Sequence, residues 1–136
     1  MGFKLDHIGV AVKDIQASLD FYQKAMGLTL LGEEEVPSEK VKTAFLDTGE
    51  CHLELLEPTS DDSPIAKFIE KRGPGVHHIC LKVENIEAVM AQLKASGAKL
   101  INETPKIGAG NKKVAFIHPK STGGVLLELS EAISEA

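Results

Sequence analysis

Residues 77–86, HHICLKVENI, repeat the pattern of residues 6–15, DHIGVAVKDI, 71 positions further along the chain. In both stretches apolar residues alternate with other residues, a pattern typical of a β-strand. A residue suited to cap a helix follows each strand, Asp14 in the first copy and Asn85 in the second. Strand, cap and helix recur together, which predicts two copies of one structural module.

The first copy continues with a helix in which Ile15, Leu19, Tyr22 and Met26 recur at helical spacing, and Gly27 is placed to end it. The second copy continues with a helix over NIEAVMAQLKASG and then with AKLINE, residues 98–103, whose alternation predicts a strand.

The later strands also recur. Ala44 and Phe45 match Ala115 and Phe116, and LEL at 53–55 matches LEL at 127–129. We therefore expect an α+β fold, in which two tandem βαβββ modules form a cupped mixed sheet. The 136 residues make one domain, with module one at about 3–58, a linker helix at about 63–73 and module two at about 75–131.

The repeat selects two histidines. Side chains alternate between the faces of a strand, so His7 lies opposite the apolar face formed by Ile8 and its neighbours. His78 is its counterpart in the second module. The adjacent His77 falls on the apolar side, where we expect packing or a hydrogen bond instead of metal binding.

The repeat also selects two glutamates. Glu54 and Glu128 each stand between two leucines, so each carboxylate points away from the leucine face. One such glutamate is most simply solvated, but burying a carboxylate is costly unless it is paired or binds a metal. Two imidazoles and two carboxylates at matching positions suit a divalent metal such as Co²⁺, Mn²⁺, Ni²⁺ or Zn²⁺.

These residues carry a resemblance over essentially the whole chain. With SPIAKFIEKRG, GVHHI and AFIHPKSTGGVLLEL, the chain is similar to the vicinal oxygen chelate superfamily, and within it to epimerases of (R)- and (S)-methylmalonyl-CoA. The resemblance implies an acyl-CoA thioester substrate, an enolate, and a metal, most often cobalt, on His7, Glu54, His78 and Glu128. It also implies a homodimer, and Glu128 as one base.

The second base is less directly indicated. Some related epimerases carry a further glutamate one strand before the position of Glu54, and this chain has Thr43 at about that place. Glu54 is the candidate on symmetry alone. Lys112, Lys113 and Lys120 lie in loops beside the last strands, and one or more is expected to contact CoA phosphates or the substrate carboxylate.

Three alternatives share the predicted fold. Glyoxalase I has the same order of ligands, but HPKSTGGVL favours the epimerase over the shorter turn usual in glyoxalases. An extradiol dioxygenase would leave Glu54 without a role. A metal-free binding module would not need the four ligands.

Composition narrows the partners and the compartment. The net charge of −5 disfavours general binding to nucleic acid, and no stretch is apolar for long enough to cross a membrane. The N-terminal residues MGFK lead directly into a strand pattern, so no signal peptide is expected. Two cysteines make no disulfide framework, and we expect a cytoplasmic protein.

Overall fold

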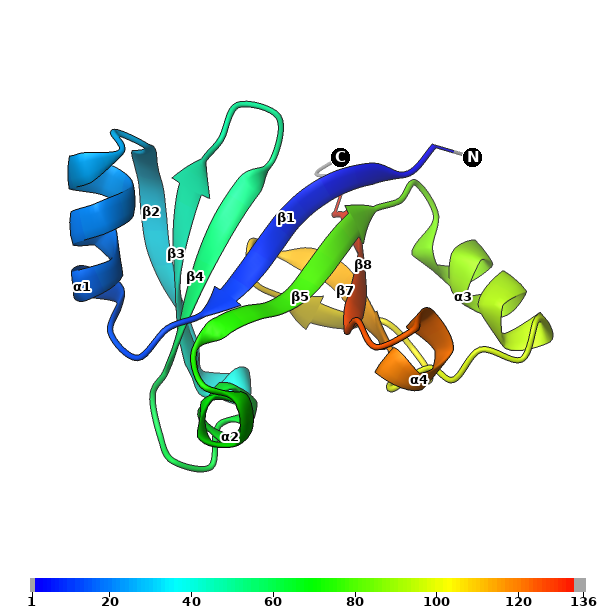
Figure 1. The fold of residues 1–136 in the computed structure, drawn as a ribbon. Coiled ribbons are helices and arrows are strands. Elements are labelled where there is room, and N and C mark those ends of the chain that lie inside the picture. The colour runs from blue at the N-terminus through cyan, green and yellow to red at the C-terminus, as the bar shows by residue number, and fades with distance from the viewer. Residues whose placement is uncertain (1, 134–136) are drawn as a thin grey trace. The chain divides into compact units, whose positions relative to one another are not determined.

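The protein is described by a computed structural model over residues 2–133 (Figure 1). The first half contains β1 (Lys4–Ala11), α1 (Ile15–Leu19), the π-helix η1 (Asp20–Ala25), β2 (Thr29–Val36), the 3-10 helix η2 (Pro37–Glu39), β3 (Val41–Asp47), β4 (His52–Pro58) and α2 (Pro64–Arg72). The second half contains β5 (Gly75–Lys82), α3 (Ile86–Ala95), β6 (Lys106–Gly108), β7 (Lys112–Ile117), α4 (Pro119–Thr122) and β8 (Leu127–Ala132).

The predicted α+β fold with two βαβββ modules is confirmed. In the first module the strands lie in the order β2-β3-β4-β1, with β1 and β4 parallel and the other pairs antiparallel. In the second module the order is β5-β8-β7-β6, again with one parallel pair, β5 and β8. Among the described residues, contacts group His7–His77 into one compact unit and residues 2–6 and 78–133 into another. How the chain divides into domains stays a prediction.

One face of each sheet is covered by the helix of its own module (Figure 1). In the first module Leu55, which is fully buried, packs with Ile15 and Leu19 of α1. In the second module Leu129 packs with Ile86 of α3. The opposite face of each sheet is called here the site face.

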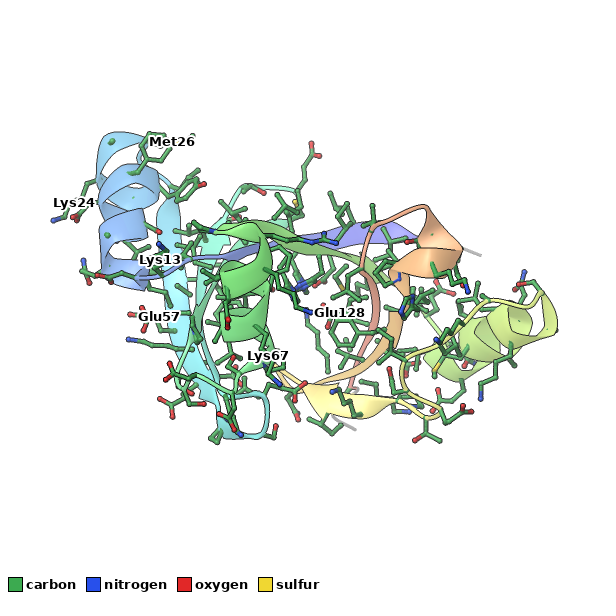
Figure 2. The ribbon with its side chains drawn as sticks, turned by 60° about the horizontal axis from the view of Figure 1, so that its bottom comes forward. Lys13, Lys24, Met26, Glu57, Lys67 and Glu128 are labelled. Carbon is green, nitrogen blue, oxygen red and sulfur yellow. The ribbon has the colours of Figure 1, made fainter. Side chains whose placement is uncertain are left out.

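The starts of the two helices are fixed in the same way. The side chain of Asp14 accepts a hydrogen bond from the amide of Gln16, and the side chain of Asn85 caps α3. A glutamate from the last strand of each module then accepts from the first helical amide. Glu57, labelled in Figure 2, accepts from Ile15 at 2.7 Å, and Glu131 accepts from Ile86 at 2.8 Å. The first four backbone N–H groups of a helix have no partner within the helix. Each of these carboxylates accepts a hydrogen bond from one such group.

The first helix differs from the prediction at its end. Gly27 follows Asp14 by one residue more than Gly97 follows Asn85, and η1 absorbs the extra residue in a π-helical turn, with the amide of Met26 donating to Phe21. The wider turn rotates Met26 away from the core, so this residue is 58% exposed instead of packed (Figure 2). Met26 therefore follows the helical spacing of the sequence but lies outside the core of the first module.

The predicted strand at residues 98–103 is also absent. Leu100 makes an isolated bridge to Ile117, but the side chain of Asn102 then accepts the hydrogen bond of the Phe116 amide at 2.8 Å. A side-chain acceptor takes the place of a backbone carbonyl there and interrupts the ladder. Strand pairing resumes at β6, after Pro105.

The helix predicted as a linker packs against the first module. Ser63 accepts from the amide of Ile65, and Pro64 occupies the first helical position, where its missing N–H costs nothing. Ile65 is buried with Ala11 and Leu56, on the site face of the sheet. Among the described residues, no helix has the length and apolar character needed to cross a membrane.

Candidate active site

The first module buries a histidine–glutamate pair on its site face. His7 lies on β1, where it alternates with Ile8, and Glu54 lies on the neighbouring β4, opposite Gly9. The Nδ1 atom of His7 is 3.1 Å from a carboxylate oxygen of Glu54, and each side chain is 7% exposed. Glycine at position 9 places no side chain beside the carboxylate.

The second module buries an equivalent pair. His78 lies on β5 and Glu128, labelled in Figure 2, lies on the neighbouring β8. The Nε2 atom of His78 is 2.9 Å from a carboxylate oxygen of Glu128, and both side chains are buried. The ring of Phe116, which lies opposite Glu128 on β7, meets the ring of His78 edge to face at 6.0 Å.

Both pairs fit the donor chemistry of a divalent metal. Each joins one imidazole nitrogen to one carboxylate, and these side chains are almost fully shielded from solvent. A buried carboxylate needs a charged or hydrogen-bonding partner, and the imidazole supplies it within each module. The same atoms are ligands that Co²⁺, Mn²⁺, Ni²⁺ and Zn²⁺ accept. The four residues selected by the repeat therefore form two pairs, His7 with Glu54 and His78 with Glu128.

His77 lies in different surroundings from His78. Its ring packs edge to face on Phe68 of α2, with the ring centroids 4.9 Å apart. Thr43, at the place where a second base was sought, is 1% exposed and faces Leu56 across β3 and β4. A hydroxyl of ordinary acidity is not a carboxylate base, so Thr43 offers no replacement for one.

The three candidate lysines do not lie in loops as predicted, because Lys112 and Lys113 belong to β7 and Lys120 belongs to α4. Lys112 shares the site face of β7 with Val114 and Phe116, and its ammonium is 3.1 Å from Asp6. Lys113, the next residue on β7, therefore points to the opposite face of the sheet.

On that other face, Lys113 lies 3.2 Å from Glu87 of α3. The backbone amide of Glu87 itself, and then the Lys113 ammonium, lower the pKa of that carboxyl. Lys120 lies in the short helix α4, where its amide donates to Nδ1 of His118.

The sequence pattern did not indicate a role for two residues on the site face of the second module. Phe116 stands against His78, and the repeat of Ala44–Phe45 as Ala115–Phe116 carried the signal for it. Ser130, two positions after Glu128, is 1% exposed and its hydroxyl has no hydrogen-bond partner among the described residues. Nothing in the sequence could reveal that hydroxyl as unpaired, because pairing depends on the packed neighbours.

Comparison with known proteins now identifies the family. The model of the glyoxalase/bleomycin resistance protein/dioxygenase superfamily matches residues 6–116. The chain belongs to this superfamily. It is 40% identical to the mitochondrial methylmalonyl-CoA epimerase of Homo sapiens over 130 residues, which cover 95% of this chain and 74% of that protein.

Two solved structures are close in fold. The hypothetical protein BH1468 of Bacillus halodurans is 50% identical, with a TM-score of 0.96 and coverage of 100% of this chain and 99% of the other. A Streptomyces coelicolor methylmalonyl-CoA epimerase variant in complex with 2-nitronate-propionyl-CoA is 34% identical, with a TM-score of 0.90 and coverage of 96% and 98%. The resemblance to methylmalonyl-CoA epimerases is confirmed.

Proposed function

We propose that this chain is a methylmalonyl-CoA epimerase, which interconverts the (R)- and (S)-forms of its acyl-CoA substrate. The observation that carries the proposal is the buried histidine–glutamate pair on the site face of each module. Relatives and solved structures named as methylmalonyl-CoA epimerases support the choice of substrate.

The two pairs are proposed to hold one divalent metal ion, with His7, Glu54, His78 and Glu128 as ligands. Cobalt is the metal proposed, and manganese, nickel and zinc suit the same donors. The support is the repeat, which makes the two pairs equivalent, together with the donor chemistry of each pair. When bound, such an ion polarises a carbonyl oxygen and stabilises negative charge that develops on it.

Epimerisation requires a proton to leave one face of the α-carbon and another to return to the opposite face. The α-carbon lies between a thioester and a carboxylate. Loss of its proton leaves an enolate that is no longer chiral. A carboxylate oxygen takes the proton as the C–H bond breaks, and a carboxylic acid on the other side donates a proton as the new C–H bond forms. No oxidant or further reactant is needed.

Glu128 is proposed as one of these proton-transfer groups. Glu54 is proposed as the other, because it occupies the corresponding position in the first module. A carboxylate that also serves as a metal ligand is a weaker base, so each glutamate has to act through the oxygen that is not engaged as a ligand. The 3.1 Å contact of Glu54 with His7 involves one of its oxygens.

Binding of the CoA portion, the cellular compartment and the oligomeric state are also proposed. Lys112, Lys113 and Lys120 are proposed to include a contact with CoA phosphates or with the substrate carboxylate. The protein is proposed to be a cytoplasmic homodimer. Size-exclusion chromatography with light scattering measures the oligomeric state directly, and a mass of one chain would refute the dimer.

Metal content measured together with α-proton exchange tests the function. The purified protein should contain a divalent metal and exchange the α-proton of methylmalonyl-CoA with D₂O, and chelation should abolish exchange. Activity on the glutathione hemithioacetal of methylglyoxal, with none on methylmalonyl-CoA, would indicate glyoxalase I instead. Binding of small molecules with neither metal nor exchange would indicate a binding module.

A further inference from the structure

A buried hydroxyl without a partner lies next to the site residues of the second module. Ser130 follows Glu128 by two positions on β8, so both side chains lie on the site face. The Ser130 hydroxyl is shielded from solvent and has no hydrogen-bond partner in the described chain. Such an atom is costly and uncommon in a native protein, so it calls for a partner that binding brings.

The neighbours of Ser130 across the sheet are cationic. The strand register places Lys82 beside it on β5 and Val114 beside it on β7, and Lys106 of β6 lies beyond Val114. Because cross-strand partners share a face, the four side chains form one row, called here the serine row. The serine row contains two lysines and no carboxylate.

One of these lysines lies over the ring of Phe116. The ammonium of Lys106 lies 5.8 Å from the centroid of the Phe116 ring. Phe116 stands opposite Glu128 and against the ring of His78. A positive charge and an unpaired hydroxyl donor therefore lie on the face of the second module that also carries Glu128.

The repeat shows that this arrangement is particular to the second module. The corresponding row of the first module runs from Ala11 through Leu56 and Thr43 to Glu34. Ser130 thus takes the place of a leucine, and Lys106 takes the place of a glutamate. The two rows therefore differ in the charge of their side chains, which are cationic at two positions of the serine row and anionic at Glu34 in its counterpart.

We propose that Ser130 and Lys106 bind the free carboxylate of the acyl-CoA substrate. The hydroxyl donates a hydrogen bond to one carboxylate oxygen, and the ammonium provides the opposite charge. The inference rests on the proposed function, because this carboxylate distinguishes methylmalonyl-CoA from propionyl-CoA. An acyl group without it would leave the hydroxyl unpaired, so the serine row would determine specificity.

Binding of two ligands to the metal-loaded protein tests this inference. Titration calorimetry measures the Kd of racemic methylmalonyl-CoA and of propionyl-CoA, which has the same CoA phosphates but no carboxylate. We expect Ser130→Ala and Lys106→Met each to weaken methylmalonyl-CoA by about tenfold and to leave propionyl-CoA unchanged. Thr43→Val, which removes a buried hydroxyl from the corresponding row of the first module, should change neither affinity.

The outcomes separate the inference from the function. If the wild type prefers methylmalonyl-CoA and both variants keep that preference, the inference is overturned. An equal loss for both ligands also overturns it, because the residues would then act on the CoA portion. A wild type that neither binds methylmalonyl-CoA nor exchanges its α-proton refutes the proposed function itself. Thermal melting should show Ser130→Ala at least as stable as the wild type, since the variant buries no unpaired hydroxyl.

Discussion

The two modules differ at their outer strands, β2 in the first and β6 in the second. The difference lies beside Phe45 in the first module and beside the equivalent Phe116 in the second. In the first module β2 has eight residues and accommodates an extra one, Leu31, in a bulge beside Phe45. In the second module β6 has three residues, because the Asn102 side chain takes the amide of Phe116. The ladder is thus interrupted at corresponding places by two different means.

The histidine–glutamate pairs differ in the ring nitrogen that meets the carboxylate, Nδ1 in His7 and Nε2 in His78, but not in their place on the strands. The closest nitrogen–oxygen distances are 3.1 Å in the first module and 2.9 Å in the second, and all four side chains are buried. Both pairs lie on the parallel strands of their modules, away from the variable edges. The comparison teaches that insertions are absorbed at the outer strands β2 and β6 and in the helices, while the parallel strand pairs keep the site residues at matching positions.

The largest expected effect separates the two adjacent histidines. His78→Ala should abolish metal binding, because it removes a ligand from the second pair. His77→Ala should retain the metal, because that ring packs on Phe68. Metal analysis of both purified variants measures the effect. Loss of metal in the His77 variant alone would show that the wrong histidine has been assigned.

The next effect divides the two glutamates. Glu128→Gln and Glu54→Gln each keep an oxygen ligand but remove a base, so each should slow epimerisation by about 10²-fold to 10⁴-fold. In D₂O each variant should still exchange the α-proton of one epimer and fail with the other, and the two variants should fail with opposite epimers. If Glu54→Gln epimerises at the wild-type rate, Glu54 is a ligand and not a base.

A smaller effect concerns the helices. Deleting Lys24 should convert the π-turn of η1 to an ordinary α-helical turn and cost little stability, because the extra residue is what the π-turn accommodates. Deleting the exposed Gln92 from α3 should rotate Leu93 away from the core of the second module and cost about 2–5 kcal/mol. Urea unfolding compares the two deletions. Equal losses would contradict the insertion account of η1.

The smallest predicted effect distinguishes the neighbouring lysines of β7. Lys112→Met should raise KM for methylmalonyl-CoA about tenfold, or about 1.4 kcal/mol, because Lys112 lies on the site face. Lys113→Met should leave KM unchanged, since that side chain pairs with Glu87 on the helix side. Steady-state kinetics on both variants measures the two KM values. A larger rise in KM for Lys113→Met than for Lys112→Met would show that the CoA portion lies on the helix side of the sheet instead of the site face.

Much of this could be predicted from the sequence because the chain carries its own comparison. The repeated order of strand, cap and helix matched His7 with His78 in the sequence. The leucines around Glu54 and Glu128 predicted the face to which each carboxylate points. Strand alternation is a local property, so these predictions needed no knowledge of packing.

Local pattern was least informative where packing overrides it. Met26 continues a helical spacing, but one inserted residue rotates it into solvent. Residues 98–103 alternate as a strand should, but Asn102 competes for the backbone hydrogen bond. The unpaired hydroxyl of Ser130 depends on every neighbour of that atom, and no sequence pattern reports it.

The central claim is that the two histidine–glutamate pairs hold a single metal ion. Metal stoichiometry by mass spectrometry tests it most directly, on the wild type and on the His7→Ala and His78→Ala variants. The account predicts one ion per chain in the wild type and none in either variant, because each module supplies half of the ligands. Two ions per wild-type chain, or one ion retained when either histidine is removed, would show that each module binds its own metal and would contradict the account.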